Sequence, residues 1–214
     1  MKKKYFLAFL KIFSSLFVLL TAALTNPIIG QTKNINAQRG LALWKTFSPS
    51  DASFKVSLPQ DPEELILPGA SNENIKIKIY KLERPSEKFS IFLFRSPKPT
   101  ISDNDRREFF RGLLEQIPAG GFGDSNMYVR SHQESFQNDV FKQESVTEFN
   151  GNLIRTKGFA SKNISYLLMY THPYLPSVPE ELNQIYQDEA DKFFNSFRLL
   201  DTKNAGNLSK VKTR

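Results

Sequence analysis

Hydrophobic and polar residues alternate along most of the chain from residue 44 onward, and this period of two predicts β-strands. The alternation begins with Phe54, Val56 and Leu58, which polar residues separate. The stretch Trp44–Glu64 is therefore expected to form the first hairpin of a fold rather than a functional site. Further strands are predicted over residues 63–67, 75–82, 89–94, 127–136, 140–149, 152–160, 164–172 and 196–200.

Two segments carry the four-residue apolar spacing of amphipathic helices. Residues 102–117 begin with a Ser-x-x-Asp cap, and residues 177–194 begin with a Ser-x-x-Glu cap and a proline in the first turn. In the first helix, Phe109 and Phe110 are expected to face a sheet. The arginines of the same helix, which are expected to face water, are Arg106, Arg107 and Arg111.

The order of these elements predicts an α+β domain. Four strands, a helix, four strands, a second helix and a closing strand follow one another, and the short turns between strands imply antiparallel pairing. Residues 83–88, which include Pro85, are expected to form a hairpin loop. The strand 164–172 is apolar on both faces, which places it centrally in one antiparallel sheet. Helices packed on this sheet complete the predicted fold.

The first 37 residues have the composition of an export signal. Three lysines precede an apolar stretch whose uninterrupted part, residues 12–24, is shorter than the ~20 residues of a membrane-spanning helix. Cleavage near residue 30 or 37 would place the protein in the periplasm, a lumen or the extracellular space, and an uncleaved anchor is the alternative. Residues 44–200 are then expected to be one domain, and the polar tail 201–214 is expected to be disordered.

Charge and cysteine content exclude several classes of protein. The formal charge of +7 falls to +2 when the five lysines of residues 1–37 are set aside, because that segment has no acids. So small a charge gives no electrostatic reason for binding nucleic acid or an anionic membrane surface. The chain has no cysteine, which excludes disulfides and thiol catalysis. The glycine run 118–124 lacks the pattern of a phosphate-binding loop, and we expect no cofactor.

Both ends of the expected domain carry a family pattern. The second end has an aromatic pair before Ser196 and Phe197 in "FFNSFRLL". The first end has W-x2-F-x6-F-x-V-x-L-P-x2-P, formed by Trp44, Phe47, Phe54, Val56, Leu58, Pro59 and Pro62. These residues resemble bacterial extracytoplasmic domains of the Mog1/PsbP-like fold family. The resemblance implies an α/β/α layered domain without catalytic activity, and photosynthetic members of that family assist photosystem II from the lumenal side.

The two histidines are the candidates for a metal site. His132 and Glu134 are two residues apart on one strand face, and His172 ends a later strand. If the strand ends met, the three side chains would make a two-histidine, one-carboxylate site suited to zinc or manganese. The alternative is that both histidines are ordinary strand residues, because their spacing matches no ligand signature.

A proline-rich connection, residues 171–181, carries Tyr174 and Leu175. A stiff loop that presents an aromatic residue and a leucine suits contact with a partner protein. The alternative is a rigid connection between the last long strand and the final helix.

From these observations we expect a non-enzymatic, exported accessory or binding protein that acts through contacts with a protein partner in the envelope. Assistance to photosystem assembly is one branch of that expectation. The alternative is a small-ligand or metal-binding extracytoplasmic protein. A hydrolase is the third hypothesis, and it requires a serine within hydrogen-bond reach of His132 or His172.

Overall fold

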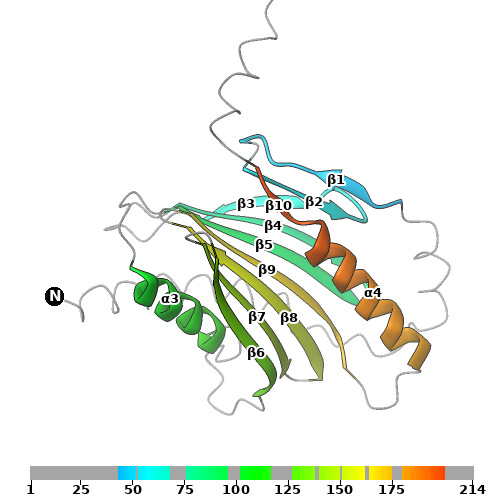
Figure 1. The fold of residues 1–214 in the computed structure, drawn as a ribbon. Coiled ribbons are helices and arrows are strands. Elements are labelled where there is room, and N and C mark those ends of the chain that lie inside the picture. The colour runs from blue at the N-terminus through cyan, green and yellow to red at the C-terminus, as the bar shows by residue number, and fades with distance from the viewer. Residues whose placement is uncertain are drawn as a thin grey trace, which may run out of the picture. The chain divides into compact units, whose positions relative to one another are not determined.

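The computed structural model describes most of the chain from residue 43 to residue 200 (Figure 1). The described residues are 43–51, 53–67, 76–95, 102–116, 127–137, 140–149, 151–161, 164–174 and 180–200. They form two compact units. One holds the described residues of Glu63–Pro176, and the other holds those of Thr32–Pro62 and Ser177–Arg214.

The first unit is built on a seven-stranded antiparallel sheet in the order β3-β4-β5-β9-β8-β7-β6. Its elements are β3 (Glu63–Leu67), β4 (Lys76–Arg84), β5 (Glu87–Arg95), α3 (Asp103–Gln116), β6 (Met127–Gln137), β7 (Val140–Phe149), β8 (Asn152–Ala160) and β9 (Ile164–Pro173). The predicted antiparallel pairing and the α+β class are confirmed. The strand that is apolar on both faces, β9, is the central one, as predicted.

The hairpin loop predicted over residues 83–88 is shorter in the structure. β4 continues to Arg84 and β5 starts at Glu87, so only Pro85 and Ser86 form the turn. The strands extend because the buried Glu87 carboxylate accepts hydrogen bonds from Arg84 and from Tyr170 of β9. Periodicity could not reveal this, since the partner that holds Glu87 lies far along the chain.

A two-residue turn joins β7 to β8. Phe149 of β7 pairs with Asn152 of β8, so the connection between the two strands is short. Gly151 has a φ of +72°, a conformation that costs glycine little and that suits the tight hairpin.

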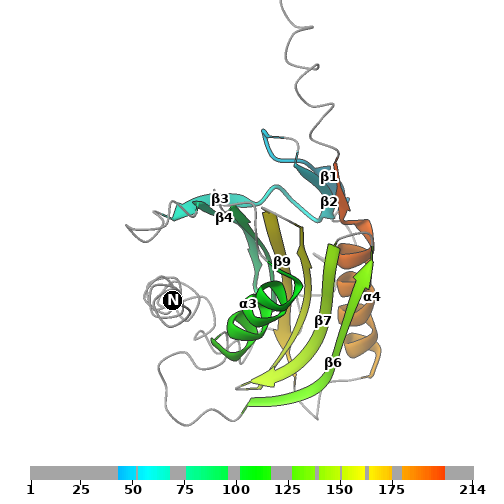
Figure 2. The same cartoon turned by 60° about the vertical axis from the view of Figure 1, so that its left-hand side comes forward.

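The helix α3 lies against one face of the seven-stranded sheet, which curves around it (Figure 2). The predicted cap is present, since the Ser102 hydroxyl accepts a hydrogen bond from the Asp105 backbone N–H at 3.2 Å and donates one to the Asp105 carboxylate at 2.7 Å. Phe110 is fully buried, and its ring fills the space that a side chain at Gly158 would take, at 2.6 Å from an ideal Cβ.

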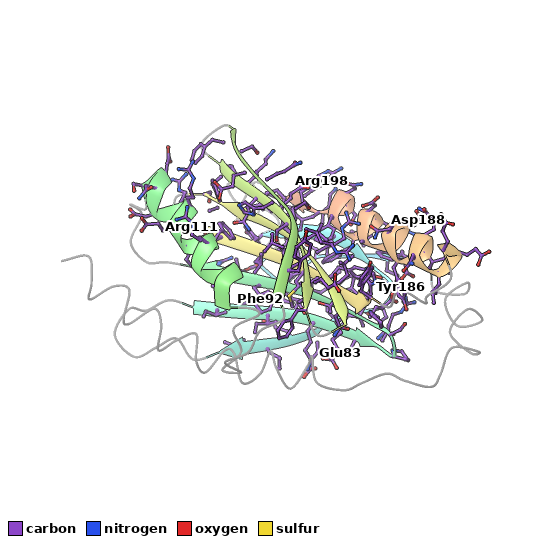
Figure 3. All side chains as sticks on the ribbon, turned by 90° about the horizontal axis from the view of Figure 1, so that it is seen from below. Glu83, Phe92, Arg111, Tyr186, Asp188 and Arg198 are labelled. Atoms are coloured by element: carbon purple, nitrogen blue, oxygen red, sulfur yellow. The ribbon has the colours of Figure 1, made fainter. Side chains whose placement is uncertain are left out.

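The sheet face that contacts α3 carries the main core, and it is called the α3 face below. Phe110 stacks on Phe141 of β7 at 5.7 Å between ring centroids, and Phe109 meets Phe94 of β5 edge-on at 5.3 Å. Both phenylalanines thus face the sheet as predicted. The other core members are Ile77, Ile79, Phe92 (labelled in Figure 3), Phe149, Ile154, Ala160, Leu167 and Met169.

One of the three α3 arginines departs from the prediction. Arg107 and Arg111 are exposed as expected, but Arg106 is only 5% exposed. Its guanidinium lies 5.9 Å from the ring centroid of Phe136 on β6 and 3.6 Å from the Asp103 carboxylate. The long side chain therefore covers an aromatic ring of the outermost strand while its charge is offset by an acid of its own helix.

The second unit pairs segments from both ends of the described chain. Its elements are β1 (Lys45–Phe47), β2 (Phe54–Leu58), α4 (Glu180–Ser196) and β10 (Arg198–Leu199), with strand order β1-β2-β10. The first hairpin predicted from Trp44 onward is therefore present as β1 and β2. The prediction of one sheet is wrong, because β2 pairs with β1 and β10 instead of joining the larger sheet.

Aromatic packing and one serine hold the second unit together. The rings of Phe54 and Phe197 lie 5.4 Å apart. The Ser196 hydroxyl accepts a hydrogen bond from the Ser57 backbone N–H at 2.8 Å and donates one to the Phe193 carbonyl at 2.9 Å. The residues of the closing family pattern thus connect α4 to β2 and are scaffold positions.

Candidate functional site

The edge strand β6 carries two of the three predicted metal ligands. His132 Nε2 lies 3.1 Å from a Glu134 carboxylate oxygen, and the Nε–H of Arg107 on α3 donates to the other carboxylate oxygen at 2.9 Å. The three side chains are 39%, 26% and 45% exposed, respectively. They form a partly solvated chain of contacts between α3 and β6.

His172 lies on the opposite face of the sheet. The register places His132 opposite Ser145, Ser145 opposite Thr156, and Thr156 opposite Met169 on β9. His172 is three residues further along β9, and an odd step turns a side chain to the other face. The strand spacing alone separates the two histidines by roughly 14 Å.

The predicted three-ligand metal site is therefore not assembled. His172 is buried, and its Nδ1 lies 2.9 Å from the Pro173 carbonyl oxygen, to which it donates. In the described part of the chain, no three histidine, aspartate or glutamate side chains come together as metal ligands. The prediction failed because it needed the strand ends to meet, and the register and the side-chain parity of β9 prevent this.

Two rows of polar side chains cross the α3 face beside the α3 core. In one row, Glu134 is opposite Gln143, which is opposite Gly158. In the other row, His132 is opposite Ser145, which is opposite Thr156. Together with Arg107, these residues are called the polar cluster below. The polar cluster consists of Arg107, His132, Glu134, Gln143, Ser145 and Thr156.

Gln143 is the unusual member of the polar cluster. It is 1% exposed, and neither its amide oxygen nor its amide nitrogen has a hydrogen-bond partner among the described residues. Leaving a buried polar group unpaired costs roughly 1–3 kcal/mol, so native proteins rarely keep one without a ligand, water or functional reason. Sequence analysis missed Gln143, because a glutamine in an alternating strand is indistinguishable from a solvated residue until the register is known.

Ser145 lies directly across from His132, which bears on the hydrolase hypothesis. The Ser145 hydroxyl is paired with the Thr156 hydroxyl at 2.7 Å, and His132 is paired with Glu134. The serine and histidine thus share a face, but the serine hydroxyl has another partner in this structure. The hydrogen bond between Ser145 and Thr156 thus fixes two hydroxyl groups on the same sheet face as Gln143.

A second polar network lies at the β4–β5 turn on the opposite sheet face. The Glu87 side chain is 1% exposed, and its carboxylate accepts one hydrogen bond from Arg84 Nη1 and one from the Tyr170 hydroxyl at 2.8 Å. The Tyr170 ring lies 5.6 Å from that of His172. Because Arg84, Glu87 and Tyr170 are all engaged with one another, we assign this network to fixing the turn and the register of β4, β5 and β9.

Tyr174, one of the two predicted partner contacts, is half-buried and packs within its own unit. The Arg130 guanidinium lies 4.1 Å from the Tyr174 ring centroid and also donates to Glu148 at 2.7 Å. Hydrogen bonds to Tyr174 and, with a smaller effect, to Glu148 raise the pKa of Arg130. The Tyr174 backbone N–H donates to the Gly151 carbonyl at 2.6 Å. Leu175 and the glycine run 118–124 lie outside the described residues.

The strand β6 carries three of the four large apolar side chains that are exposed among the described residues of the first unit. The fourth is Ile66 of β3. Its described side chains from Tyr128 to Phe136 are all exposed, and β7 is its one partner in the sheet order. Tyr128 is 65% exposed, Val129 48% and Phe136 42%. The pairing with β7 is interrupted by a bulge between Val129 and Ser131.

Taken together, the elements define an α+β protein with antiparallel sheets. No protein-family model and no curated protein matches the sequence. Among solved structures, the chain is similar to cyanobacterial PsbP from Synechocystis, with 11% identity and a TM-score of 0.48 over 80% of this chain and 99% of that one.

Two further structures show smaller likenesses. A Pseudomonas aeruginosa protein of unknown function has 11% identity and a TM-score of 0.35, over 70% of this chain and 95% of that one. A type VI secretion immunity protein of the same organism has 10% identity and a TM-score of 0.30, over 80% of this chain and 64% of that one. These likenesses do not establish a common function, and the proposals below rest on the chain's own residues.

The helices of the first and second units also bear on membrane association. Among the described residues, no helix has both the length and the apolar character needed to cross a bilayer.

Proposed function

We propose that this protein is a non-enzymatic binding protein that recruits an extended segment of a protein partner to the outer edge of β6, which has no partner strand among the described residues. Main-chain hydrogen bonds to an open strand provide affinity in this mode of recognition, and alternate side chains provide specificity. The observation that carries the proposal is the length and exposure of β6, eleven residues at the end of the sheet order.

The strand β6 has only part of the usual protection of an edge strand. Exposed edges are commonly guarded by lysines, prolines or inward-pointing charges. Both charges in the described side chains of β6 are already paired: Arg130 with Glu148 and Glu134 with Arg107. The strand has no lysine and no proline. The bulge at Val129 and Ser131 disrupts one end of the strand and leaves His132–Gln137 in regular register.

Photo-crosslinking from β6 tests the proposal. Ser131, Gln133 and Ser135 alternate with inward-facing residues, so a photoreactive amino acid at each would report on one side of an added strand. We expect each of the three positions to crosslink the same partner in its native cell fraction. The crosslinked partner residues should be two apart and run in one direction, because strand side chains alternate.

The matched control position is Asp188, which is exposed on α4 (Figure 3). A photoreactive residue there should not capture the same partner. The variant Ser135→Lys should weaken capture from Gln133 while thermal unfolding stays unchanged, since a charge on an edge discourages strand addition. Equal capture from Asp188, or capture that Ser135→Lys leaves intact, would overturn the proposal. Crosslinks between two β6 strands would show self-association instead of a different partner.

Export is part of the same proposal. It rests on the composition of residues 1–37, which lie outside the described residues, and mass spectrometry of the mature N-terminus tests it. A role in photosystem assembly rests on the sequence resemblance alone, and the identity of the crosslinked partner decides it.

A further inference from the structure

The polar cluster extends from a solvated rim to a buried floor. Its rim consists of Arg107, His132 and Glu134, which keep between a quarter and half of their side-chain surface. Its floor consists of Gln143, Ser145 and Thr156, each at most 4% exposed. Hydrogen-bonding groups thus continue from the exposed rim to the buried floor.

The floor offers a donor beside an acceptor. The oxygen and the nitrogen of the Gln143 amide lie at the same end of one planar group, and neither has a hydrogen-bond partner in the described part of the chain. The Ser145 and Thr156 hydroxyls, two residues along the same face, are paired with one another at 2.7 Å. An amide edge on a ligand, with its own carbonyl and N–H, would satisfy both atoms of Gln143 at once.

One wall of the floor is apolar. Gly158 is the cross-strand neighbour of Gln143, and the Phe110 ring occupies the space above Gly158. Phe141, two residues before Gln143 on the same face, stacks on that ring. A ligand that reaches Gln143 therefore meets an aromatic surface beside the amide.

The charges of the rim balance each other. Arg107 and Glu134 form an ion pair at 2.9 Å, and His132 contacts the same carboxylate. A charged ligand would meet a like charge at the rim, Glu134 for an anion and Arg107 for a cation. It would also carry an unpaired charge to a buried floor, which is costly. An uncharged ligand avoids both penalties.

We infer that the polar cluster binds a small uncharged ligand with an amide-type edge and an apolar body, through the Gln143 amide. The floor of this site lies on β7 and β8, one and two strands in from β6, and its rim includes His132 and Glu134 on β6 itself. The Gln143 amide is then unpaired in this structure because its partner is a ligand.

Benzamide is the probe, because it joins an amide edge to an aromatic ring. In an NMR titration of the full chain, we expect the Gln143 side-chain N–H₂ signals to shift with saturation. Benzoate and benzylammonium have a similar shape and carry opposite charges. We expect the affinity for each to be at least about tenfold lower than the affinity for benzamide. The variant Gln143→Leu should abolish benzamide binding, which is read in both proteins from the backbone N–H signals of Ser145 and Thr156.

The folding of Gln143→Leu should not be impaired, so a loss of benzamide binding can be attributed to the missing amide. Leucine is of similar size and removes an unpaired buried amide, so Gln143→Leu should fold at least as stably as the natural chain. Unchanged benzamide binding by Gln143→Leu would overturn the inference. So would the absence of any saturable shift, which would mean that the amide is satisfied by water alone. Equal binding of all three probes would contradict the assignment of an uncharged ligand.

Discussion

The seven-stranded sheet ends in two very different edge strands. β3 has five residues, and two of them are acids in ion pairs with β4: Glu64 with Lys78 at 3.0 Å and Glu63 with Lys81 at 3.8 Å. β6 has eleven residues, exposes three large apolar side chains and carries a bulge near one end. The two edges therefore differ in length, in charge and in apolar exposure.

The difference teaches that only one edge is protected by its own sequence. A short strand offers few unpaired backbone groups to an incoming strand. A long strand offers more of those groups, and β6 has no lysine or proline to oppose another chain. The edge β6 is instead braced from the side by α3, through Arg106 on Phe136 and Arg107 on Glu134. β6 is thus held by α3 in addition to β7, whereas the two ion pairs of β3 described above join it to its neighbour strand alone.

Removing the anchor of α3 should break this comparison with the largest effect. We expect Phe110→Ala to lower the free energy of unfolding by about 3–5 kcal/mol, because the ring is fully buried between α3 and the sheet. Amide hydrogen exchange should rise more in β6 than in β3. Chemical denaturation and exchange mass spectrometry measure the two effects.

Leu65→Ala is the matched control on the other edge. Leu65 of β3 packs against the same core, and its loss should raise exchange in β3 and leave β6 protected. Equal loss of protection at both edges in Phe110→Ala would contradict the distinction between them.

Sequence patterns predicted the fold of the first unit closely, because its strands carry strong alternation and short turns. They missed the second sheet, since the pairing of β2 with β10 joins segments that no local pattern connects. They also placed Arg106 in water, because a helical period cannot show that Phe136 of a later strand lies beneath it. These failures share one cause: each depends on a contact between distant segments.

The ion pairs of the two edges allow a finer comparison. We expect Glu64→Gln to lower the free energy of unfolding by about 0.2–1 kcal/mol, because the pair with Lys78 is partly exposed. Arg107→Gln should cost a similar amount, since that pair is also exposed. The two variants should differ in their side effects: Glu64→Gln should promote association through β3, and Arg107→Gln should loosen α3.

Sedimentation at increasing protein concentration and exchange in α3 distinguish the two outcomes. If Arg107→Gln left exchange in α3 and β6 unchanged, the bracing of that edge by the helix would be wrong.

The smallest expected effect concerns Lys88, which lies on β5 and points to the α3 face of the sheet. Burial lowers the pKa of Lys88, with Glu83 opposing the shift and Lys81 adding to it. Between this lowered pKa and the ordinary value of 10.5, the unfolded chain binds more protons than the folded one. The contribution of Lys88 to stability therefore rises with pH in that window.

Denaturation of Lys88→Met at neutral and mildly alkaline pH measures this contribution. We expect the variant to be more stable than the natural chain at neutral pH and to have a flatter pH profile. Lys45→Met, on an exposed residue of β1, is the control and should leave the profile unchanged. If Lys88→Met did not flatten the dependence of stability on pH, the lowered pKa of Lys88 would be contradicted.

The candidate site was only half accessible from the sequence. The nearness of His132 and Glu134 follows from a step of two on one strand, and the structure confirms it. The place of His172 requires the register of three intervening strand pairs, which the sequence does not show. Gln143 became visible only when its burial and its missing partners were known.

The hydrogen bond between Ser57 and Ser196 joins two segments that the ribosome makes at well-separated times. The two residues are 139 positions apart, and β10, the second neighbour of β2, comes later still. At a synthesis rate of about 5–20 residues per second, β1 and β2 emerge roughly 7–28 s before their partners exist. A two-stranded ribbon is marginally stable in water during that wait. A nascent chain that stops before α4 would therefore lack the segments that complete the second unit.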